Sequence, residues 1–328
     1  MKAIRYYAYG SPDVLQLQDI DMPAIGSDDV LVRVRAASVN PLDWHFMRGK
    51  PYIARLQAGL ARPKANARRL GADMAGTVEA VGDNVTKFAR GDDVFGGLPT
   101  LGTLAEYISV PQDGVVLHKP ASMTFEQAAA VPVAGFTALQ ALRDKGRLRA
   151  GHKVLVNGAA GGVGTFAVQI AKALGAAEVT GVCSTANVEM VGSIGADHVI
   201  DYTKADYTSS GQRYDMLIDI AGNRTLAECR RVLEPAGVLV GVGGPDKGRW
   251  IGPVARAVQM LLLSPLVSQR LVVFLAQQRR DDLAVLRDLL ESGQVTPVID
   301  RTYALSEVAK AIAYLETGHA RGKVVITV

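Results

Sequence analysis

Four glycines separate an apolar run from a helical pattern near the middle of this chain. The run is KVLVNG (153–158), and the helical pattern places apolar residues at i, i+3, i+4 and i+7: Ala167, Ile170, Ala171 and Leu174. A turn between a strand and a helix exposes helix N–H groups that lack acceptors and carry partial positive charge. A pyrophosphate satisfies both, provided that no Cβ blocks its approach. The pattern Ala159-x-Gly161-x-x-Gly164 therefore predicts a dinucleotide site, and a close-packed turn without a ligand is the alternative.

The sequence around this turn alternates strands with mostly helical segments. Five further apolar runs follow KVLVNG, namely EVTGVCS, HVIDY, YDMLIDIAG, GVLVGVGG and RLVVFLA. Such alternation is typical of a doubly wound parallel sheet, in which crossover helices connect neighbouring strands. We therefore expect an α/β protein with a Rossmann dinucleotide-binding domain over residues 124–292.

The two ends of the chain read differently. Residues 1–123 contain short β segments with glycines between them, which is typical of a small β-rich barrel. Residues 293–328 read as strand, helix and strand, and they do not continue the alternation. We expect 1–123 and 293–328 to form one β-rich domain together.

Composition limits the classes of partner. Lys and Arg number 36 and Asp and Glu 32, a balance too small to indicate nucleic acid binding. A local basic cluster, Lys64, Arg68 and Arg69, is either a solvated loop or an anion or nucleic-acid patch. The two cysteines, Cys183 and Cys229, fit no metal spacing and read as buried thiols. No membrane partner is expected, and the expected location is the cytoplasm.

The end of the second strand bears on the choice between NADPH and NADH. Enzymes that use NAD place a carboxylate there, against the ribose 2′-hydroxyl. This strand ends at Ser184 and Thr185 without one, and Tyr202 ends the third strand. These hydroxyls favour a 2′-phosphate and hence NADPH, with NADH less favoured. The absence of Arg or Lys between Ser184 and Asp197 weakens the argument.

Several motifs are distributed along nearly the whole chain: GSPDVLQL, VNPLDW, GADMAGTVEAVG, AAAVPVAGFTAL, GAAGGVG, GADHVIDY and RGKVVI. Taken together, they resemble the zinc-independent quinone oxidoreductase branch of the medium-chain dehydrogenase/reductase superfamily. The resemblance implies a GroES-like catalytic domain built from both chain ends, a Rossmann domain between them, and homodimers or homotetramers. The zinc enzymes of the superfamily carry a cysteine where this chain has Asn40 and a His-Glu pair where it has Ala72-Asp73. Without those ligands no zinc is expected, and the acceptor must be electrophilic by itself.

The same resemblance implies roles for particular residues. It places Asn40 and Asp43 near the nicotinamide ribose and the reacting atoms, although Asp43 also fits a helix cap. It offers Tyr52 as the general acid, with solvent as the competing proton donor. The implied cofactor-binding residues are Asn40, Thr137, Gly161, Gly162, Val163, Ser184, Tyr202, Ala221, Gly243, Phe274, Leu275 and Lys323. A plain helix residue is the alternative for Thr137, tight turns for Ala221 and Gly243, and a surface lysine for Lys323.

Two functions fit these patterns. The first is an NADPH-dependent reductase that transfers hydride to a small-molecule quinone or α,β-unsaturated carbonyl. The second is an NADPH-binding protein with little turnover that acts as a structural, sensing or RNA-associated component, because cofactor binding alone does not make a catalyst. Residues 245–270 fit either a cover over the site or a subunit contact.

Overall fold

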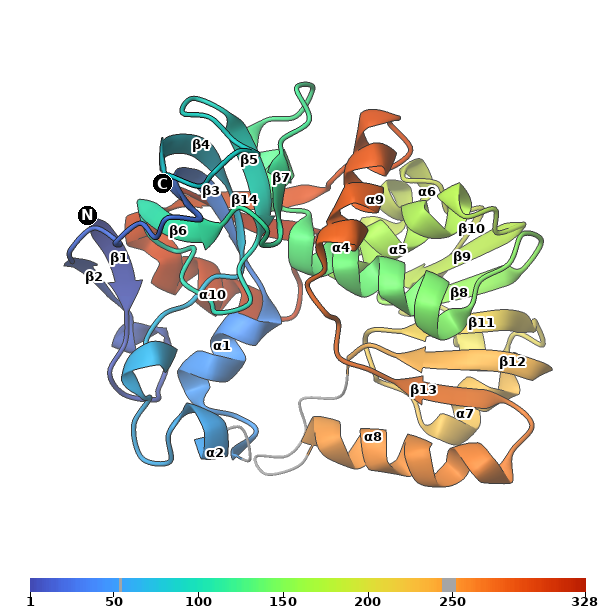
Figure 1. The fold of residues 1–328 in the computed structure, drawn as a ribbon. Helices are drawn as coiled ribbons and strands as arrows, with labels where there is room; N and C mark the ends of the chain where they lie inside the picture. Colours follow the sequence, from blue (N-terminus) through green and yellow to red (C-terminus); the bar gives the residue numbers. More distant parts are fainter. Residues whose placement is uncertain (53–54, 244–251) are drawn as a thin grey trace. The chain divides into compact units, whose positions relative to one another are not determined.

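A computed structural model describes residues 1–52, 55–243 and 252–328 of the chain. It divides into two compact units, each considered by itself (Figure 1). The first comprises Met1–Phe136, Gln278–Glu291 and Pro297–Val328, and the second comprises Thr137–Gln277 and Ser292–Thr296. The second unit is shorter than the Rossmann domain that we expect over residues 124–292, because residues 124–136 and 278–291 belong to the first unit. Within the first unit, Leu286 of the helix at 280–291 packs against Gly135, which explains why these segments belong together.

The first unit is built on a mixed sheet whose strands come from both ends of the chain. The strand order among its described residues is β14-β15-β3-β4-β5-β7, and β6 pairs with β3 beside this path. The last strand, β15, runs antiparallel to β3 and parallel to β14, as expected for a C-terminal segment that returns to the first domain. The strands are β1 (Lys2–Arg5), β2 (Gln16–Asp19), β3 (Asp29–Val39), β4 (Asp73–Val81), β5 (Asp93–Gly97), β6 (Tyr107–Pro111), β7 (Val116–His118), β14 (Ile299–Ala304) and β15 (Lys323–Thr327).

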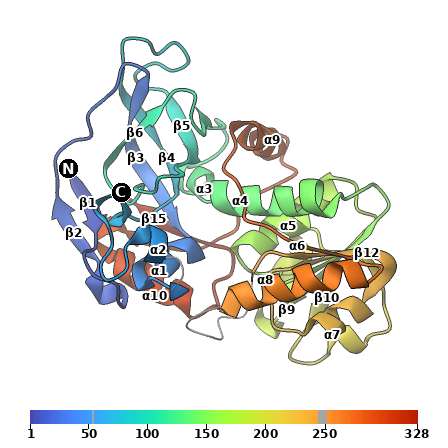
Figure 2. The same cartoon turned by 60° about the horizontal axis from the view of Figure 1, so that its bottom comes forward.

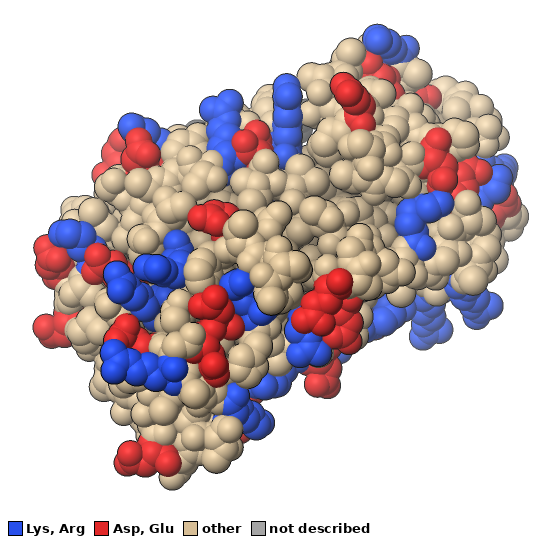
Figure 3. All heavy atoms as spheres, turned by 90° about the horizontal axis from the view of Figure 1, so that it is seen from above, with Lys and Arg blue, Asp and Glu red and all other residues tan. Residues whose placement is uncertain are grey.

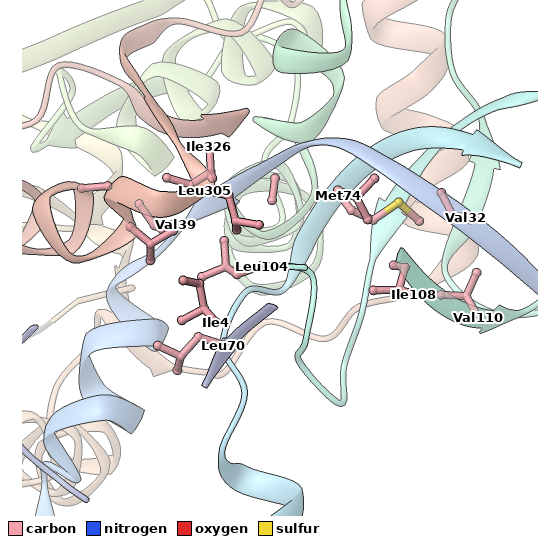
Figure 4. Packing of buried hydrophobic residues seen from close by; sticks show 14 of the residues in the cluster. Ile4, Val32, Val39, Leu70, Met74, Leu104, Ile108, Val110, Leu305 and Ile326 are labelled. Carbon is pink, nitrogen blue, oxygen red and sulfur yellow. The ribbon is translucent and has the colours of Figure 1, made fainter. Parts of the chain in front are cut away.

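Alternation of apolar and polar residues explains how this sheet forms its core. In β3, Val30, Val32 and Val34 are buried while Arg33 and Arg35 are exposed. Figure 4 shows part of the resulting cluster, to which β1, β3, β4, β6 and β15 contribute. The helices of this unit are α1 (Pro41–Arg48), α2 (Arg55–Ala58), α3 (Phe125–Ala129), α9 (Arg280–Glu291) and α10 (Val308–Glu316), while α4 (Pro132–Leu139) passes into the second unit.

The second unit confirms the predicted parallel sheet. Its described strands lie in the order β10-β9-β8-β11-β12-β13, and all five pairings are parallel. Within this unit α5 and α6 lie on one side of the sheet and α7 and α8 on the other (Figures 1 and 2). The elements are β8 (Lys153–Asn157), α5 (Gly162–Ala173), β9 (Glu178–Cys183), α6 (Val188–Ser193), β10 (His198–Asp201), β11 (Tyr214–Asp219), α7 (Leu226–Arg231), β12 (Leu233–Gly241), α8 (Gly252–Leu263) and β13 (Arg270–Val273).

Strand order reverses between β8 and β11, which places a topological switch point at the carboxyl ends of these two strands. In open parallel sheets, ligands bind in the crevice beyond such a point. The predicted glycine turn follows β8 and therefore lies at this position.

The structure shows the distribution of surface charge and the burial of the two cysteines. On the face drawn in Figure 3, Lys and Arg are interspersed with Asp and Glu. Cys183 and Cys229 are both buried and free, and burial raises the pKa of each thiol to about 11. Within the described residues, no helix is long and apolar enough to cross a membrane. Of the segment 245–270, only the part from Gly252 onward lies within the described residues.

Candidate functional site

The first candidate site is a buried polar cluster within the first unit. Asn40 follows β3, Asp73 begins β4 and Lys323 begins β15. Strand register brings them together, because Ser38 pairs with Asp73 and Val39 pairs with Val324. The exposed fractions of Asn40, Asp73 and Lys323 are 3%, 0% and 3%. The alternative of a surface lysine at position 323 is therefore wrong: β15 is an interior strand of the sheet.

Asp73 is the centre of this cluster. Its Oδ2 accepts hydrogen bonds from Ser38 Oγ (2.7 Å), Asn40 Nδ2 (2.9 Å) and Lys323 Nζ (3.3 Å), and its Oδ1 accepts one from Val133 N (2.9 Å). Lys323 Nζ also donates to Asn40 Oδ1 (2.5 Å). The buried ammonium and carboxylate neutralise each other, as buried charges require. The Asn40 amide is held at both its oxygen and its nitrogen.

Asp43 adopts the helix-cap arrangement that the sequence allowed. Asn40 is the N-cap of α1, and Asp43 Oδ2 accepts a hydrogen bond from the Asn40 backbone N–H at 2.7 Å. Asp43 Oδ1 accepts another from the backbone N–H of Gly71, also at 2.7 Å. Burial raises the pKa of this carboxyl from 3.8 to about 6, against the lowering effect of these two hydrogen bonds. Asp43 thus ties the start of α1 to the segment that leads into β4.

Tyr52 lies between α1 and α2 and is half-buried. The guanidinium carbon of Arg55 is 4.7 Å from the centroid of its ring and 4.3 Å from that of Tyr9. Both aromatic rings therefore make cation–π contacts with one charged side chain. The role of Tyr52 as a proton donor stays a prediction.

The second candidate site is the glycine turn of the second unit. Gly161, Gly162 and Val163 are partly exposed, whereas the rest of α5 up to Ala171 is buried. Gly158 has φ +92°, in the region that favours glycine. A Cβ on Gly164 would lie 2.1 Å from the carbonyl oxygen of Gly158, so this glycine permits close packing of helix and strand. A Cβ on Gly161 would meet only that oxygen, at 3.6 Å, so packing within the chain does not require glycine there.

Polar side chains join the strand ends at the switch point. Asn157 Nδ2, at the end of β8, donates to Asp219 Oδ1 at the end of β11 (2.8 Å). Asp219 is fully buried and forms an ion pair with Arg256 of α8. Ala221 lies just beyond β11 and Gly243 just beyond β12, and both are exposed, as a backbone that a cofactor approaches must be. A Cβ on Gly243 would lie 2.1 Å from the carbonyl oxygen of Ile220, so the tight-turn interpretation also holds for Gly243.

The end of β9 differs from the sequence expectation in one respect. Ser184 and Thr185 are there, but β10 brings Asp201 beside them: Thr185 Oγ1 donates to Asp201 Oδ2 at 2.6 Å. Hydrogen bonds from Thr185 and Thr203 hold the pKa of Asp201 at about 2. Lys204 Nζ lies 3.5 Å from the same carboxylate oxygen. A carboxylate is therefore present at this edge, supplied by the neighbouring strand.

The remaining cofactor-binding candidates lie elsewhere on the second unit. Thr137 is partly buried in α4, and Phe274 follows β13 with Lys145 Nζ 5.9 Å from its ring centroid. Leu275 is 91% exposed. Tyr202 is also exposed, and its backbone N–H donates to the carbonyl of Cys183 at 3.0 Å.

Sequence reasoning missed Asp73, Asp201 and Asp219 as parts of these sites. Each is the first or last residue of its strand. Asp73 accepts a hydrogen bond from Asn40, Asp201 accepts one from Thr185, and Asp219 accepts one from Asn157, which directly precedes the glycine turn. A carboxylate at the end of a predicted strand was the available signal. Within the described residues, no group of three or more His, Cys, Asp or Glu side chains is placed to hold a metal ion.

Comparison with known proteins identifies the family. Residues 26–121 match the alcohol dehydrogenase GroES-like domain, and residues 194–326 match the zinc-binding dehydrogenase family. The chain is 35% identical to the chloroplastic NADPH-dependent alkenal/one oxidoreductase of Arabidopsis thaliana, over 99% of this chain and 79% of that protein. It belongs to the quinone oxidoreductase branch of the medium-chain dehydrogenase/reductase superfamily.

Solved structures agree with this assignment. The quinone oxidoreductase from Coxiella burnetii is 32% identical and superposes with a TM-score of 0.86, covering 100% of this chain and 99% of its own. The quinone oxidoreductase of Escherichia coli, solved in complex with NADPH, is 26% identical with a TM-score of 0.84 and full coverage of both chains. The predicted family and the GroES-like plus Rossmann fold are therefore confirmed, and this family member is an oxidoreductase.

Proposed function

We propose that this oxidoreductase transfers a hydride from NADPH to quinones or to the β-carbon of α,β-unsaturated carbonyl compounds. The proposal depends above all on the open backbone at Gly161, at the head of α5 and at the switch point of the parallel sheet. The relatives described above carry the names of quinone and alkenal/one oxidoreductases, which favours an enzyme over the alternative of a binding protein with little turnover.

The residues of the glycine turn fit a dinucleotide. The first N–H groups of α5, at Gly162 and Val163, have no acceptor within the helix and are partly exposed. Together with the space beside Gly161, they would bind the pyrophosphate. The exposed backbone at Ala221 and Gly243 would approach the ribose, and Thr137, Phe274 and Leu275 remain our candidates for the nicotinamide end. The bound cofactor supplies the hydride.

The residues of the buried cluster act by position and charge. Because Lys323 and Asp73 fix both ends of the Asn40 amide, we propose Asn40 as the residue that orients the nicotinamide ribose, with Lys323 as its positioning residue. Asp43 fixes the Asn40 backbone. In an ene reduction the α-carbon must gain a proton after the hydride reaches the β-carbon, and Tyr52 or solvent would supply it.

We further propose that the reaction is independent of zinc. The Lys323 ammonium already supplies a positive charge beside Asp73, and it donates to the amide at position 40. Neither an amide nor a carboxylate already paired with a lysine offers the thiolate or imidazole that zinc prefers. Elemental analysis of the purified protein tests this directly, and stoichiometric zinc would refute it.

The preference for NADPH depends on the edge formed by β9 and β10. Ser184, Thr185 and Tyr202 present hydroxyls there, while the Asp201 carboxylate opposes a 2′-phosphate. Lys204 offsets that charge and is 71% exposed in its side chain, so it is free to reach a phosphate. We therefore propose that Lys204 supplies the cation that the sequence lacks between Ser184 and Asp197.

The surface of the second unit supports a proposal on assembly. β13 is an edge strand of the second unit's described sheet, and Leu261, Leu262 and Leu266 next to it are exposed by 64%, 68% and 80%. An exposed apolar patch beside an unpaired strand favours a homodimer or homotetramer, which light scattering would detect. A cytoplasmic location stays a prediction from the sequence; the Arabidopsis relative is named as chloroplastic.

The function is tested by following NADPH absorbance with 1,4-benzoquinone, 9,10-phenanthrenequinone and small enones as acceptors. We expect oxidation with at least one class and loss of cofactor binding in a Gly161→Val variant, whose folding circular dichroism would verify. Absence of oxidation with every acceptor, in protein that binds NADPH, would favour the binding-protein alternative.

A further inference from the structure

The basic cluster of the sequence lies against β1, within the first unit. Tyr6 N donates to the carbonyl of Arg68 at 3.4 Å. Ile4 N donates to the carbonyl of Leu104 at 2.9 Å, and Leu104 N donates to the carbonyl of Leu70 at 3.3 Å. Ile4, Tyr6 and Leu70 are all buried in the core of this unit. Arg5 and Arg69 are partly exposed, whereas their neighbours Ile4, Tyr6 and Leu70 are buried, so the two arginines lie away from this core.

The Arg69 side chain is half-buried, and among the described residues its guanidinium forms no ion pair with a carboxylate. Its Nε is inaccessible to solvent and has no hydrogen-bond partner among the described residues. Its Cδ lies 3.2 Å from the position that a Cβ on Gly102 would take, so the side chain runs closely over that glycine. Buried donors are almost always satisfied, by protein, water or ligand.

Arg5 adds a second positive charge at the same place. Its Nη1 donates to the carbonyl of Ile4 at 2.9 Å, and burial together with the nearby charge of Arg69 lowers its pKa. Arg68 is close by as well: its guanidinium carbon is 5.1 Å from the Tyr7 ring centroid, and its Nε donates to the carbonyl of Pro63. Across the described chain, none of these three guanidinium groups forms an ion pair with a carboxylate.

We propose that Arg5, Arg68 and Arg69 form a binding site for a small oxyanion, a phosphoryl or carboxylate group, separate from the residues assigned to hydride transfer. Guanidinium groups match the two-oxygen geometry of such anions, and their hydrogen bonds to charged acceptors are strong. Repulsion between Arg5 and Arg69 is relieved when an anion binds. A small ligand fits better than a nucleic acid, because the cluster is local and the whole chain carries only +4.

Calorimetric titration of the full chain with inorganic phosphate, and separately with citrate, tests this site at constant ionic strength. We expect saturable binding that weakens by about tenfold or more in Arg69→Gln and in Arg5→Gln. Arg90→Gln is the matched control, because Arg90 is an exposed arginine of the same unit, paired with Glu79, and its loss should leave binding unchanged. Circular dichroism of each variant establishes that it is folded.

The outcomes separate the possible ligands. Binding of phosphate but not citrate would assign a phosphoryl group, and the reverse would assign a carboxylate. No saturable binding, or equal binding in Arg69→Gln, Arg5→Gln and wild type, would overturn the proposal. Tighter binding of a short single-stranded oligonucleotide than of phosphate, lost in the same variants, would replace it with a nucleic-acid surface. If Arg69→Gln does not fold, Arg5→Gln decides alone.

Discussion

Removal of the buried ammonium at position 323 is the most direct test of the cluster around Asp73. In Lys323→Met the Asp73 carboxylate loses its only charged hydrogen-bond partner in the described structure, and Asn40 Oδ1 loses its donor. Breaking a buried ion pair costs about 3–5 kcal/mol. Asp73 retains three donors, from Ser38, Asn40 and Val133, which favours the lower end of that range. The unmet amide oxygen adds about 1 kcal/mol. We therefore expect a loss of about 4 kcal/mol in the free energy of unfolding of the first unit.

Urea unfolding followed by Trp44 fluorescence measures this loss. Trp44 packs against the core of the first unit, and in a Trp250→Phe background it is the chain's single tryptophan. Lys310→Met is the control, because Lys310 pairs with Glu307 on the surface and its loss should cost below about 1 kcal/mol. Adding Asp73→Asn to Lys323→Met removes the uncompensated charge and should recover part of the loss. If Lys323→Met behaves like Lys310→Met, or if the second substitution only adds its own cost, the reasoning is wrong.

Three further predictions follow from local features. Burial raises the pKa of Asp43 to about 6, so the protonated carboxyl stabilises the folded state by up to about 3 kcal/mol at low pH, and this stabilisation is lost as the pH rises through about 6. In urea unfolding, Asp43→Ala should therefore cost more stability at about pH 4 than at about pH 7.5. An equal cost at both pH values would contradict this. Gly164→Ala should lower the melting temperature, because its Cβ would collide with the Gly158 carbonyl oxygen. Gly161→Ala should fold normally and weaken NADPH binding by about tenfold in a fluorescence titration. A destabilised Gly161→Ala, or a stable Gly164→Ala with weakened NADPH binding, would count against the assignment of the turn. Lys204→Ala should raise the Kd for NADPH several-fold and leave the Kd for NADH unchanged. Equal effects on both cofactors would show that Lys204 does not bind the 2′-phosphate.

Local periodicity was sufficient to predict the Rossmann sheet. The apolar run before the glycine pattern and the five runs after it form β8 to β13, and Thr124 with Gln127 forms a capping box at the start of α3. Each of these features depends on residues only a few positions apart, so spacing alone reveals them.

The buried cluster could not be predicted in the same way. Lys323 and Asp73 are separated by 250 positions and meet only because β15 and β4 flank β3. Asp201 likewise reaches Thr185 through the pairing of β10 with β9. A sequence pattern shows which residues end a strand, but strand order decides which of those ends are neighbours. The same holds for Arg5 and Arg69, which lie on segments that pair only in the folded unit.

The position of β15 has a consequence for synthesis of the chain. This strand lies inside the first unit's sheet, between β14 and β3, and it also carries the lysine of the buried cluster. Residues 1–136 therefore cannot complete their sheet until β15 is translated, almost two hundred positions later. Residues 137–277, in contrast, contain all six described strands of the parallel sheet. During translation the nucleotide-binding unit can fold first, and the N-terminal unit is completed only when residues 323–327 emerge.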